Sequence, residues 1–143
     1  MIAVDTNVLV YAHRADAPLH DRAVGAVTRL AESRTAWAIP WPCVHEFVAI
    51  VTHPRIFDPP TGMGAATDQV AAWMESPSLV LISETTDHWS RLVELVSGSG
   101  VVGPRIHDAR VAALCLSHGV SELWTLDRDF SRFASLRTTN PLA

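Results

Sequence analysis

Short apolar runs alternate along this chain with segments long enough for helices, and this alternation constrains the fold more than any other feature. Because strands separated by helices pair side by side in one direction, the pattern predicts an α/β fold with a parallel sheet. The runs expected to form its strands are residues 2–4, 37–39, 79–82 and 123–126, with residues 135–137 as a last edge strand.

Helices are expected between these strands. They cover residues 18–33, 42–52, 67–75, 87–96 and 108–118. Pro18 suits the first turn of its helix, and Gly119 suits the position just past the end of the last one. The residues after the first strand, 5–7, are expected to form a turn. The main loop is expected over residues 54–66, which contain three prolines and two glycines.

The length and composition indicate one folded domain. A chain of 143 residues buries enough surface for a full core, and with 48% hydrophobic residues disorder is not expected. No apolar run approaches the ~20 residues of a membrane span, and Asp5 follows the N-terminus too closely for a secretory leader. We therefore expect residues 1–143 to form a single domain of a cytoplasmic protein with no membrane association.

The basic and sulfur-containing residues exclude several kinds of chemistry. All 11 basic residues are arginines, so every mechanism that requires a lysine is excluded. Cys43 and Cys115 lie apart in apolar helical contexts, as buried thiols usually do, and no Cys/His cluster predicts a zinc site. The net charge of −4 says little for or against a nucleic-acid partner, because several of the carboxylates would belong to a single site.

Four acidic positions, far apart in the sequence, lie where this fold would bring them together. Asp5 and Asp127 each follow an expected strand, Asp108 begins an expected helix, and Glu46 lies within an apolar helical stretch. Ligands of open α/β sheets bind beyond the carboxyl ends of the strands. Two carboxylates about 4 Å apart repel by roughly 4 kcal/mol at an effective dielectric of 20. Their clustering therefore predicts that a divalent cation joins them.

Each of these positions also has an interpretation without chemistry. Asp5 could form a turn or cap a helix, and Asp108 could be an N-terminal cap stabilised by the helix dipole. Glu46 has apolar neighbours such as Cys43 and Ala49 on its helix face, so its alternative is a core glutamate paired with an arginine. No single position decides between the two interpretations, and only the four positions together favour a shared site.

The last strand is followed by two aspartates, Asp127 and Asp129. One of them is expected to face the site while the other caps residues 130–132, and Asp127 is the favoured neighbour of the site. The seven histidines form no metal-binding pattern. His107 is adjacent to Asp108 and is expected to be an exposed residue at a helix start.

With these residues in place, the chain resembles the PIN-domain nucleases, and specifically the VapC toxins of bacterial toxin–antitoxin pairs. The similar stretches occur in the order that the family has and extend over almost the whole chain. They are Val4–Ala12, Trp41–Phe47, Thr52–Phe57, Ile106–Ala109 and Leu123–Phe130.

The resemblance implies a three-layer α/β/α sandwich with a central parallel sheet. It also implies an endoribonuclease that depends on Mg²⁺ or Mn²⁺ and hydrolyses phosphodiester bonds in structured RNA such as transfer or ribosomal RNA. Such a protein would form a homodimer and be inhibited by a cognate VapB-like antitoxin. The catalytic residues that it implies are Asp5, Glu46, Asp108 and Asp127, with Asp129 assisting at the metal and Asn7 and Thr125 supporting the acids.

These assignments lead to a division of roles. Asp5 and Asp108 would hold the principal metal, and Asp127 or Asp129 would complete its coordination, since oxygen ligands suit Mg²⁺ and Mn²⁺. Glu46 would orient or deprotonate the attacking water, or help to bind a second ion. Arginines in loops near the acids are candidates for guiding phosphates, with solvated surface residues as the alternative; these are Arg14, Arg55, Arg105 and Arg128.

Other functions remain in competition at this point. A phosphatase or response regulator with an aspartyl nucleophile would need a lysine, which this chain lacks. A metal-binding interaction module would be stabilised by Mg²⁺ without turnover. A PIN nuclease that is not a toxin would lack an adjacent gene for a small DNA-binding antitoxin.

Overall fold

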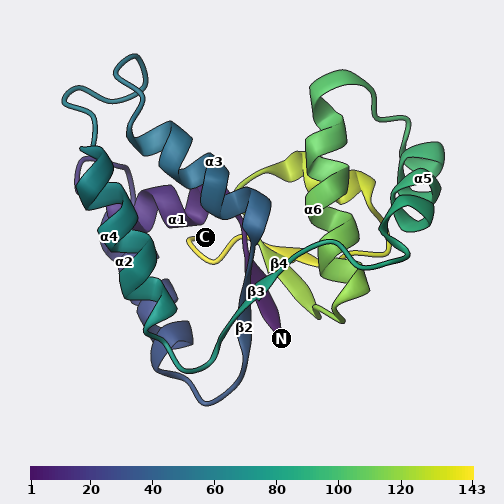
Figure 1. Ribbon diagram of the computed structural model, residues 1–143, viewed down its shortest axis with the longest axis horizontal. Helices are drawn as coiled ribbons and strands as arrows, with labels where there is room; N and C mark the ends of the chain where they lie inside the picture. Colours follow the sequence, from purple (N-terminus) through teal and green to yellow (C-terminus); the bar gives the residue numbers. More distant parts are fainter.

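The computed structural model, which describes residues 1–143, is organised around five parallel strands in the order β3-β2-β1-β4-β5. Figure 1 shows this sheet between two groups of helices. The strands are β1 (Ile2–Val4), β2 (Trp37–Pro40), β3 (Leu79–Ile82), β4 (Glu122–Trp124) and β5 (Thr138–Thr139). The predicted α/β fold with a parallel sheet is confirmed.

Helices cover both faces of the sheet. They are α1 (Thr6–His13), α2 (His20–Glu32), α3 (Trp41–Val51), α4 (Met63–Met74), α5 (His88–Ser99) and α6 (Ile106–Ser117), with short 3₁₀ helices η1 (Gly103–Arg105) and η2 (Arg128–Arg132). In Figure 1, α1 to α4 lie on one side and α5 and α6 on the other. This arrangement is the three-layer α/β/α sandwich that the resemblance implied. None of the helices combines the length and apolar character that crossing a membrane requires.

The strand order creates a switch point at the middle of the sheet. From β1 the chain adds β2 and then β3 on one side, and it later returns to add β4 and β5 on the other side. β1 and β4 are paired in parallel, with Val4 opposite Trp124. Connections therefore leave the carboxyl ends of these two neighbours in opposite directions, which opens a crevice where open α/β sheets bind ligands.

The inner strands are buried on both faces, which explains their continuous apolar sequences. Ala3, Val4 and Leu123 have no exposed surface. At the sheet edge, Val80 of β3 is 39% exposed. The rigid centre of the sheet is thus directly beneath the crevice between β1 and β4, and it fixes the backbone from which Asp5 and Thr125 emerge.

The first helix was not predicted. Residues 5–7 are not a turn, because α1 begins directly at Thr6 and Asp5 is its N-cap, with a side chain that accepts a hydrogen bond from the Thr6 backbone N–H. Val8, Leu9 and Val10 are all buried, so the helix lacks the polar face that would reveal a helical period. Packing against α2 and α3 forms this helix despite its β-branched residues.

Several boundaries also differ from the prediction. The edge strand lies at residues 138–139 instead of 135–137, because Leu136 is buried in the core and the β4 backbone pairs with the residues beyond it. α4 begins at Met63, inside the predicted loop, and α6 begins at Ile106, two residues before Asp108. β4 ends at Trp124, so the two aspartates after it lie on η2 and its N-cap.

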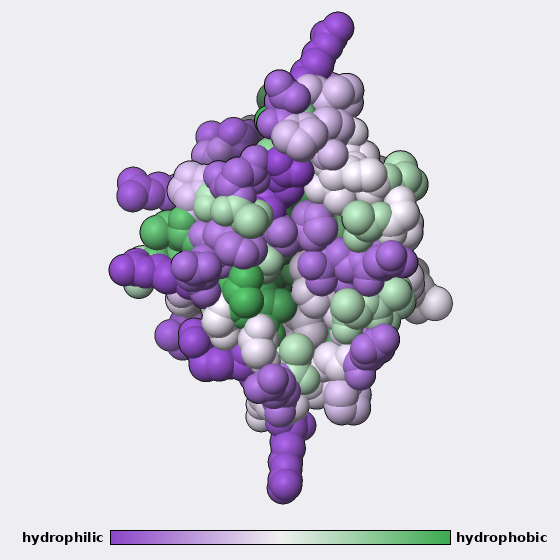
Figure 2. Space-filling view, turned by 90° about the vertical axis from the view of Figure 1, so that its left-hand side faces the viewer, coloured by the Kyte–Doolittle hydropathy of each residue, from purple (hydrophilic) through white to green (hydrophobic).

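The surface over α2 and α4 combines polar and apolar side chains. Figure 2 views the molecule from this side and shows hydrophobic patches among hydrophilic residues. Val24, Met63 and Met74 are exposed here, and a groove of about 250 Å³ lies between the two helices, lined partly by Val24, Ala72 and Trp73.

Candidate active site

Asp5 lies at the bottom of the crevice, between the end of β1 and the start of α1. Only 8% of the residue is exposed. One carboxylate oxygen, Oδ1, accepts hydrogen bonds from the Thr6 backbone N–H at 2.8 Å and from the Cys43 thiol at 3.5 Å. The other, Oδ2, accepts from the Thr125 hydroxyl at 2.8 Å. Burial nevertheless raises the pKa of Asp5, because these hydrogen bonds offset only part of the lost hydration.

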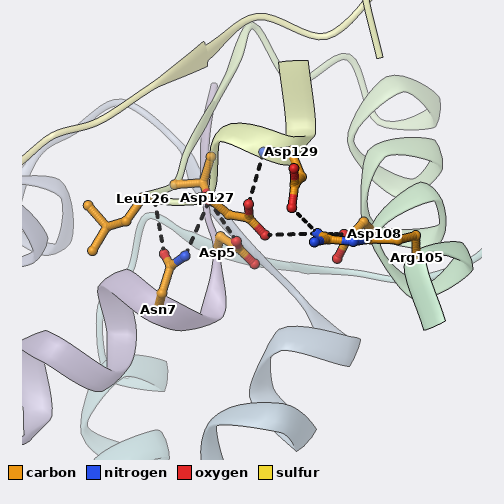
Figure 3. Close-up of polar contacts among 8 residues, drawn as sticks. Asp5, Asn7, Arg105, Asp108, Leu126, Asp127 and Asp129 are labelled. Carbon is orange, nitrogen blue, oxygen red and sulfur yellow. Dashed lines mark hydrogen bonds and ion pairs between the residues drawn. The ribbon is translucent and has the colours of Figure 1, made fainter. Parts of the chain in front are cut away.

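Thr125 and Asn7 hold this carboxylate in position. The Thr125 hydroxyl, which is donated to Asp5, accepts in turn from the Asp127 backbone N–H at 3.0 Å and from the Asn7 amide at 3.4 Å. The amide oxygen of Asn7 accepts from the Leu126 backbone N–H at 3.2 Å, as Figure 3 shows. The network therefore fixes the first turn of α1 against the segment that leaves β4. Of the two predicted supporting residues, Thr125 contacts Asp5 directly, and Asn7 reaches the acids only through Thr125.

Three further aspartates surround the guanidinium of Arg105 (Figure 3). Its Nη1 atom lies 3.2 Å from Oδ2 of Asp108 and 3.7 Å from Oδ2 of Asp127, and it also pairs with Oδ2 of Asp129. Asp127 uses its other oxygen to cap η2 by accepting from the Asp129 backbone N–H at 2.9 Å. We expected one aspartate to face the site and the other to cap the residues that follow, but Asp127 does both. Asp129 also contacts Arg105.

Asp108 occupies the first turn of α6, where Arg105 is the N-cap residue. The capping interpretation of Asp108 is therefore wrong, and its carboxylate accepts from Arg105 instead. Partial burial raises the pKa of Asp108, and the charges of Asp127 and Asp129 act in the same direction, while Arg105 opposes them. The guanidinium of Arg105 thus offsets the repulsion among these carboxylates, and the loss of hydration keeps the pKa of Asp108 raised.

Glu46 lies on α3 across from α6. Its side chain is exposed and has no ion pair, so the alternative of a core glutamate paired with an arginine is wrong. Ala49, on the same helix face, is also exposed. The helix packing still removes part of the hydration of Glu46, and this desolvation raises its pKa, with further contributions from the charges of Asp5 and Asp108. Glu46 is therefore part of the same electrostatic cluster.

A cleft of about 290 Å³ opens beside Glu46, between α3 and α6. Its lining includes His45, His107 and Arg110, none of which was predicted as a site residue. His107 is exposed, as expected, yet it faces the cleft. The three-residue spacing of Cys43 and Glu46 could have indicated that both lie on the same face of their helix. No sequence pattern predicts a cleft between two helices that are far apart in the chain, so His45, His107 and Arg110 were missed.

The predicted arginines have different surroundings. Arg105 lies among the aspartates, whereas Arg14 pairs with Asp16, donates to the Pro59 carbonyl at 2.9 Å and lies 4.3 Å from the centre of the Phe57 ring. These contacts bind Arg14 to the loop before α4. The remaining two, Arg55 and Arg128, are exposed and have no acidic partner.

The chemistry of the acidic residues suits a divalent cation with oxygen ligands. No three His, Cys, Asp or Glu side chains form a group already arranged around a metal-sized space. Three of the four aspartates instead hold the guanidinium of Arg105. With that guanidinium withdrawn, Asp5, Asp108, Asp127 and Asp129 are the residues that could hold a metal ion.

Comparison with known proteins agrees with this architecture. The family model described as PIN domain matches residues 2–136. VapC ribonuclease Mb2897 of Mycobacterium bovis is 36% identical over 142 residues, which cover 99% of this chain and 96% of the relative. Ribonuclease VapC43 of Mycobacterium tuberculosis has the same identity and coverage.

Solved structures with the same fold are also known. Mycobacterium tuberculosis VapC20, described as a sarcin–ricin loop cleaving toxin, aligns with a TM-score of 0.68 at 18% identity and covers 92% of this chain and 93% of its own. VapBC2 of Rickettsia felis, bound to a DNA fragment from its promoter, aligns with a TM-score of 0.70 at 19% identity over 97% of this chain and 98% of its own. At these identities the likeness establishes the fold.

Proposed function

Because the chain belongs to the PIN-domain family, we propose that it is an endoribonuclease of the VapC kind, the toxin of a toxin–antitoxin pair. One observation carries the proposal. Four aspartates from three separate parts of the chain converge beyond the carboxyl ends of β1 and β4, where the backbone opens at the switch point of the sheet. Relatives named VapC ribonucleases, aligned over almost the entire chain, support the same conclusion.

In this proposal Asp5, Asp108, Asp127 and Asp129 hold Mg²⁺ or Mn²⁺. When bound, the ion would polarise the scissile phosphate and stabilise the charge that develops in the transition state. Asp5 and Asp108 would supply the principal ligands, with Asp127 or Asp129 completing the coordination. The role of Thr125 is to orient the Asp5 carboxylate through the 2.8 Å hydrogen bond that it donates.

We assign the attacking water to Glu46. The residue faces a cleft, has no ion-pair partner that would have to be displaced, and has a raised pKa that makes its carboxylate a stronger base than an ordinary glutamate. A base whose pKa approaches the working pH removes a proton more effectively. The alternative role of Glu46 is to bind a second metal ion. In that case, replacing Glu46 would strongly lower the metal affinity.

Structured RNA, such as transfer or ribosomal RNA, is the proposed substrate class. Recognition would depend on shape and exposed loops, with phosphates held by arginines that have no acidic partner, such as Arg55 and Arg128. Arg110 borders the cleft beside Glu46, although it is paired with Glu84 at 2.5 Å. The cleft would accept the nucleotides next to the cleaved bond.

The proposed partner is a VapB-like antitoxin, with the protein itself acting as a homodimer in the cytoplasm. The groove between α2 and α4, and the apolar patches around it in Figure 2, offer an apolar antitoxin segment a place to bind.

Expression in a bacterial host tests the proposal. We expect induction of this chain alone to stop growth and to produce discrete new RNA 5′ ends within minutes, and co-expression of the neighbouring antitoxin gene to prevent both. Induction of the Asp108→Asn variant should leave both growth and cellular RNA unchanged. Discrete cleavage without any antitoxin gene nearby would indicate a PIN nuclease that is not a toxin. Normal growth and intact RNA, with the folded protein present, would indicate a metal-binding module without turnover.

A further inference from the structure

Arg105 makes an unusual set of contacts for a single side chain. The same nitrogen, Nη1, faces Oδ2 of Asp108, Oδ2 of Asp127 and Oδ2 of Asp129. Three carboxylate oxygens from α6, from the η2 cap and from η2 itself therefore surround one point. That point is occupied by the positive charge of the guanidinium.

The helix itself does not favour the arginine at this position. Arg105 is the N-cap residue of α6 and forms no side-chain capping bond. The N-terminus of a helix carries a partial positive charge, which repels a cation. The attraction that keeps the guanidinium in place must therefore come from the aspartates, whose mutual repulsion it reduces.

Little prevents the guanidinium from leaving. Its side chain is 45% exposed, and it is preceded by the exposed residues Gly103 and Pro104. Ion pairs with this degree of exposure are individually weak. A divalent ion that engages the same oxygens brings twice the charge, so it can replace the guanidinium without disturbing the packed core.

We propose that Arg105 is a built-in competitor of the divalent cation, holding the aspartates together in the metal-free protein and leaving them when the ion binds. The inference rests on the proposed metal-dependent function. It explains why the metal-free carboxylates are gathered but form no group arranged around a metal-sized space. It also means that the protein resists activation at low metal concentration, because every binding event must first break the contacts of Arg105.

Calorimetric titration with Mn²⁺ in the absence of RNA tests the competition. We expect Arg105→Gln to bind Mn²⁺ about tenfold more tightly than the unchanged protein, which corresponds to about 1.4 kcal/mol. Its metal-free melting temperature should fall, because the aspartates then repel one another without compensation. The matched control is Arg137→Gln, which removes an arginine that is 79% exposed and pairs with Glu122 at 3.5 Å at the other end of β4. Its Mn²⁺ affinity should be unchanged.

A second measurement uses the unchanged protein and therefore does not depend on how the variant folds. The ¹⁵Nε resonance of Arg105 should shift and narrow on titration with diamagnetic Mg²⁺, as the guanidinium becomes free. Two results would contradict the competition between Arg105 and the ion but leave the metal site in place. One is equal Mn²⁺ affinity in Arg105→Gln and the unchanged protein, and the other is an Arg105 resonance that does not shift at saturating Mg²⁺. Absence of Mn²⁺ binding in every variant would instead remove the metal site, and the proposed function with it.

Discussion

At the residue scale, Asp5 shows how a buried charge is retained. The residue receives three hydrogen bonds, yet its pKa stays raised because burial removes more stabilisation than they return. A metal-free protein therefore carries an unfavourable charge at the base of its crevice. A bound cation would compensate this charge, so the ion that the proposed reaction requires would also offset the electrostatic cost of burying Asp5.

Replacing Asp5 with Asn should stabilise the metal-free protein at neutral pH. The raised folded-state pKa means that the folded protein holds the Asp5 proton more tightly than the unfolded chain does, so this residue lowers stability as pH rises above its ordinary pKa of 3.8. The melting temperature of Asp5→Asn minus that of the unchanged protein should be near zero at pH 3.5 and a few degrees positive at pH 7. A difference that is largest in acid would contradict the raised pKa. Asp68→Asn, at an exposed position of α4, is the control.

Glu46→Gln should separate chemistry from binding. We expect the rate of RNA cleavage to fall by about 10²–10⁴, the usual contribution of a general base. The melting temperature at neutral pH should rise slightly, because the raised pKa of Glu46 marks a mildly unfavourable charge, and Mn²⁺ affinity should fall only slightly, because one nearby charge is lost. Single-turnover cleavage and calorimetry measure the two properties. A large loss of Mn²⁺ affinity would show that Glu46 is a metal ligand instead.

At the element scale, the site depends on how α1 is attached to the segment after β4. Asn7 lies in the first turn of α1 and bonds both to Thr125 and to the Leu126 backbone, across more than a hundred residues of sequence. Because this link keeps the Asp5 and Asp127 regions side by side, it both stabilises the fold and positions the acidic side chains.

We expect Asn7→Ala to lower the free energy of unfolding by about 1–2 kcal/mol, since it leaves the partly buried Leu126 backbone N–H without its acceptor and removes one hydrogen bond of the Thr125 hydroxyl. It should also weaken Mn²⁺ binding. The control is Asn140→Ala, which removes a similar local bond to the Leu142 N–H far from the acids. Urea denaturation and calorimetry measure both quantities. Equal Mn²⁺ affinity in the two variants would show that Asn7 supports only the fold.

Most elements could be predicted because the strands are buried and apolar and the helices between them have clear ends. α1 escaped prediction because its residues are apolar on nearly every side, so only tertiary packing shows it to be a helix. The sequence left open whether Glu46 is a site residue or a core glutamate, because small neighbours such as Ala49 fit buried and exposed surfaces equally well. The central place of Arg105 depends on how η2 and α6 meet in space, which no local pattern encodes.

At the scale of the whole molecule, the concentration of carboxylates in one crevice makes the net charge of −4 compatible with the proposed RNA substrate. The site concentrates negative charge at the end of the sheet, so a bound divalent ion changes both the local field and the stability. A ligand that binds only the folded state at a hundred times its dissociation constant adds about 2.7 kcal/mol of stability.

We therefore expect saturating Mg²⁺ to raise the melting temperature by roughly 5–10 °C for a chain of this size. The increase should be absent in Asp108→Asn and preserved in Asp68→Asn. Differential scanning calorimetry with and without the ion measures it. An identical increase in Asp108→Asn would place the binding of Mg²⁺ elsewhere on the molecule.

The most direct test of the account is cleavage of total RNA by the purified, antitoxin-free protein, with Mg²⁺ or Mn²⁺ or EDTA, beside Asp5→Asn and Asp68→Asn. We expect discrete fragments with the unchanged protein and with Asp68→Asn. EDTA should abolish them, and Asp5→Asn should reduce the rate by at least about a hundredfold, because several kcal/mol of charge stabilisation are lost. Cleavage that persists in EDTA or in Asp5→Asn would contradict a metal-dependent nuclease centred on this crevice.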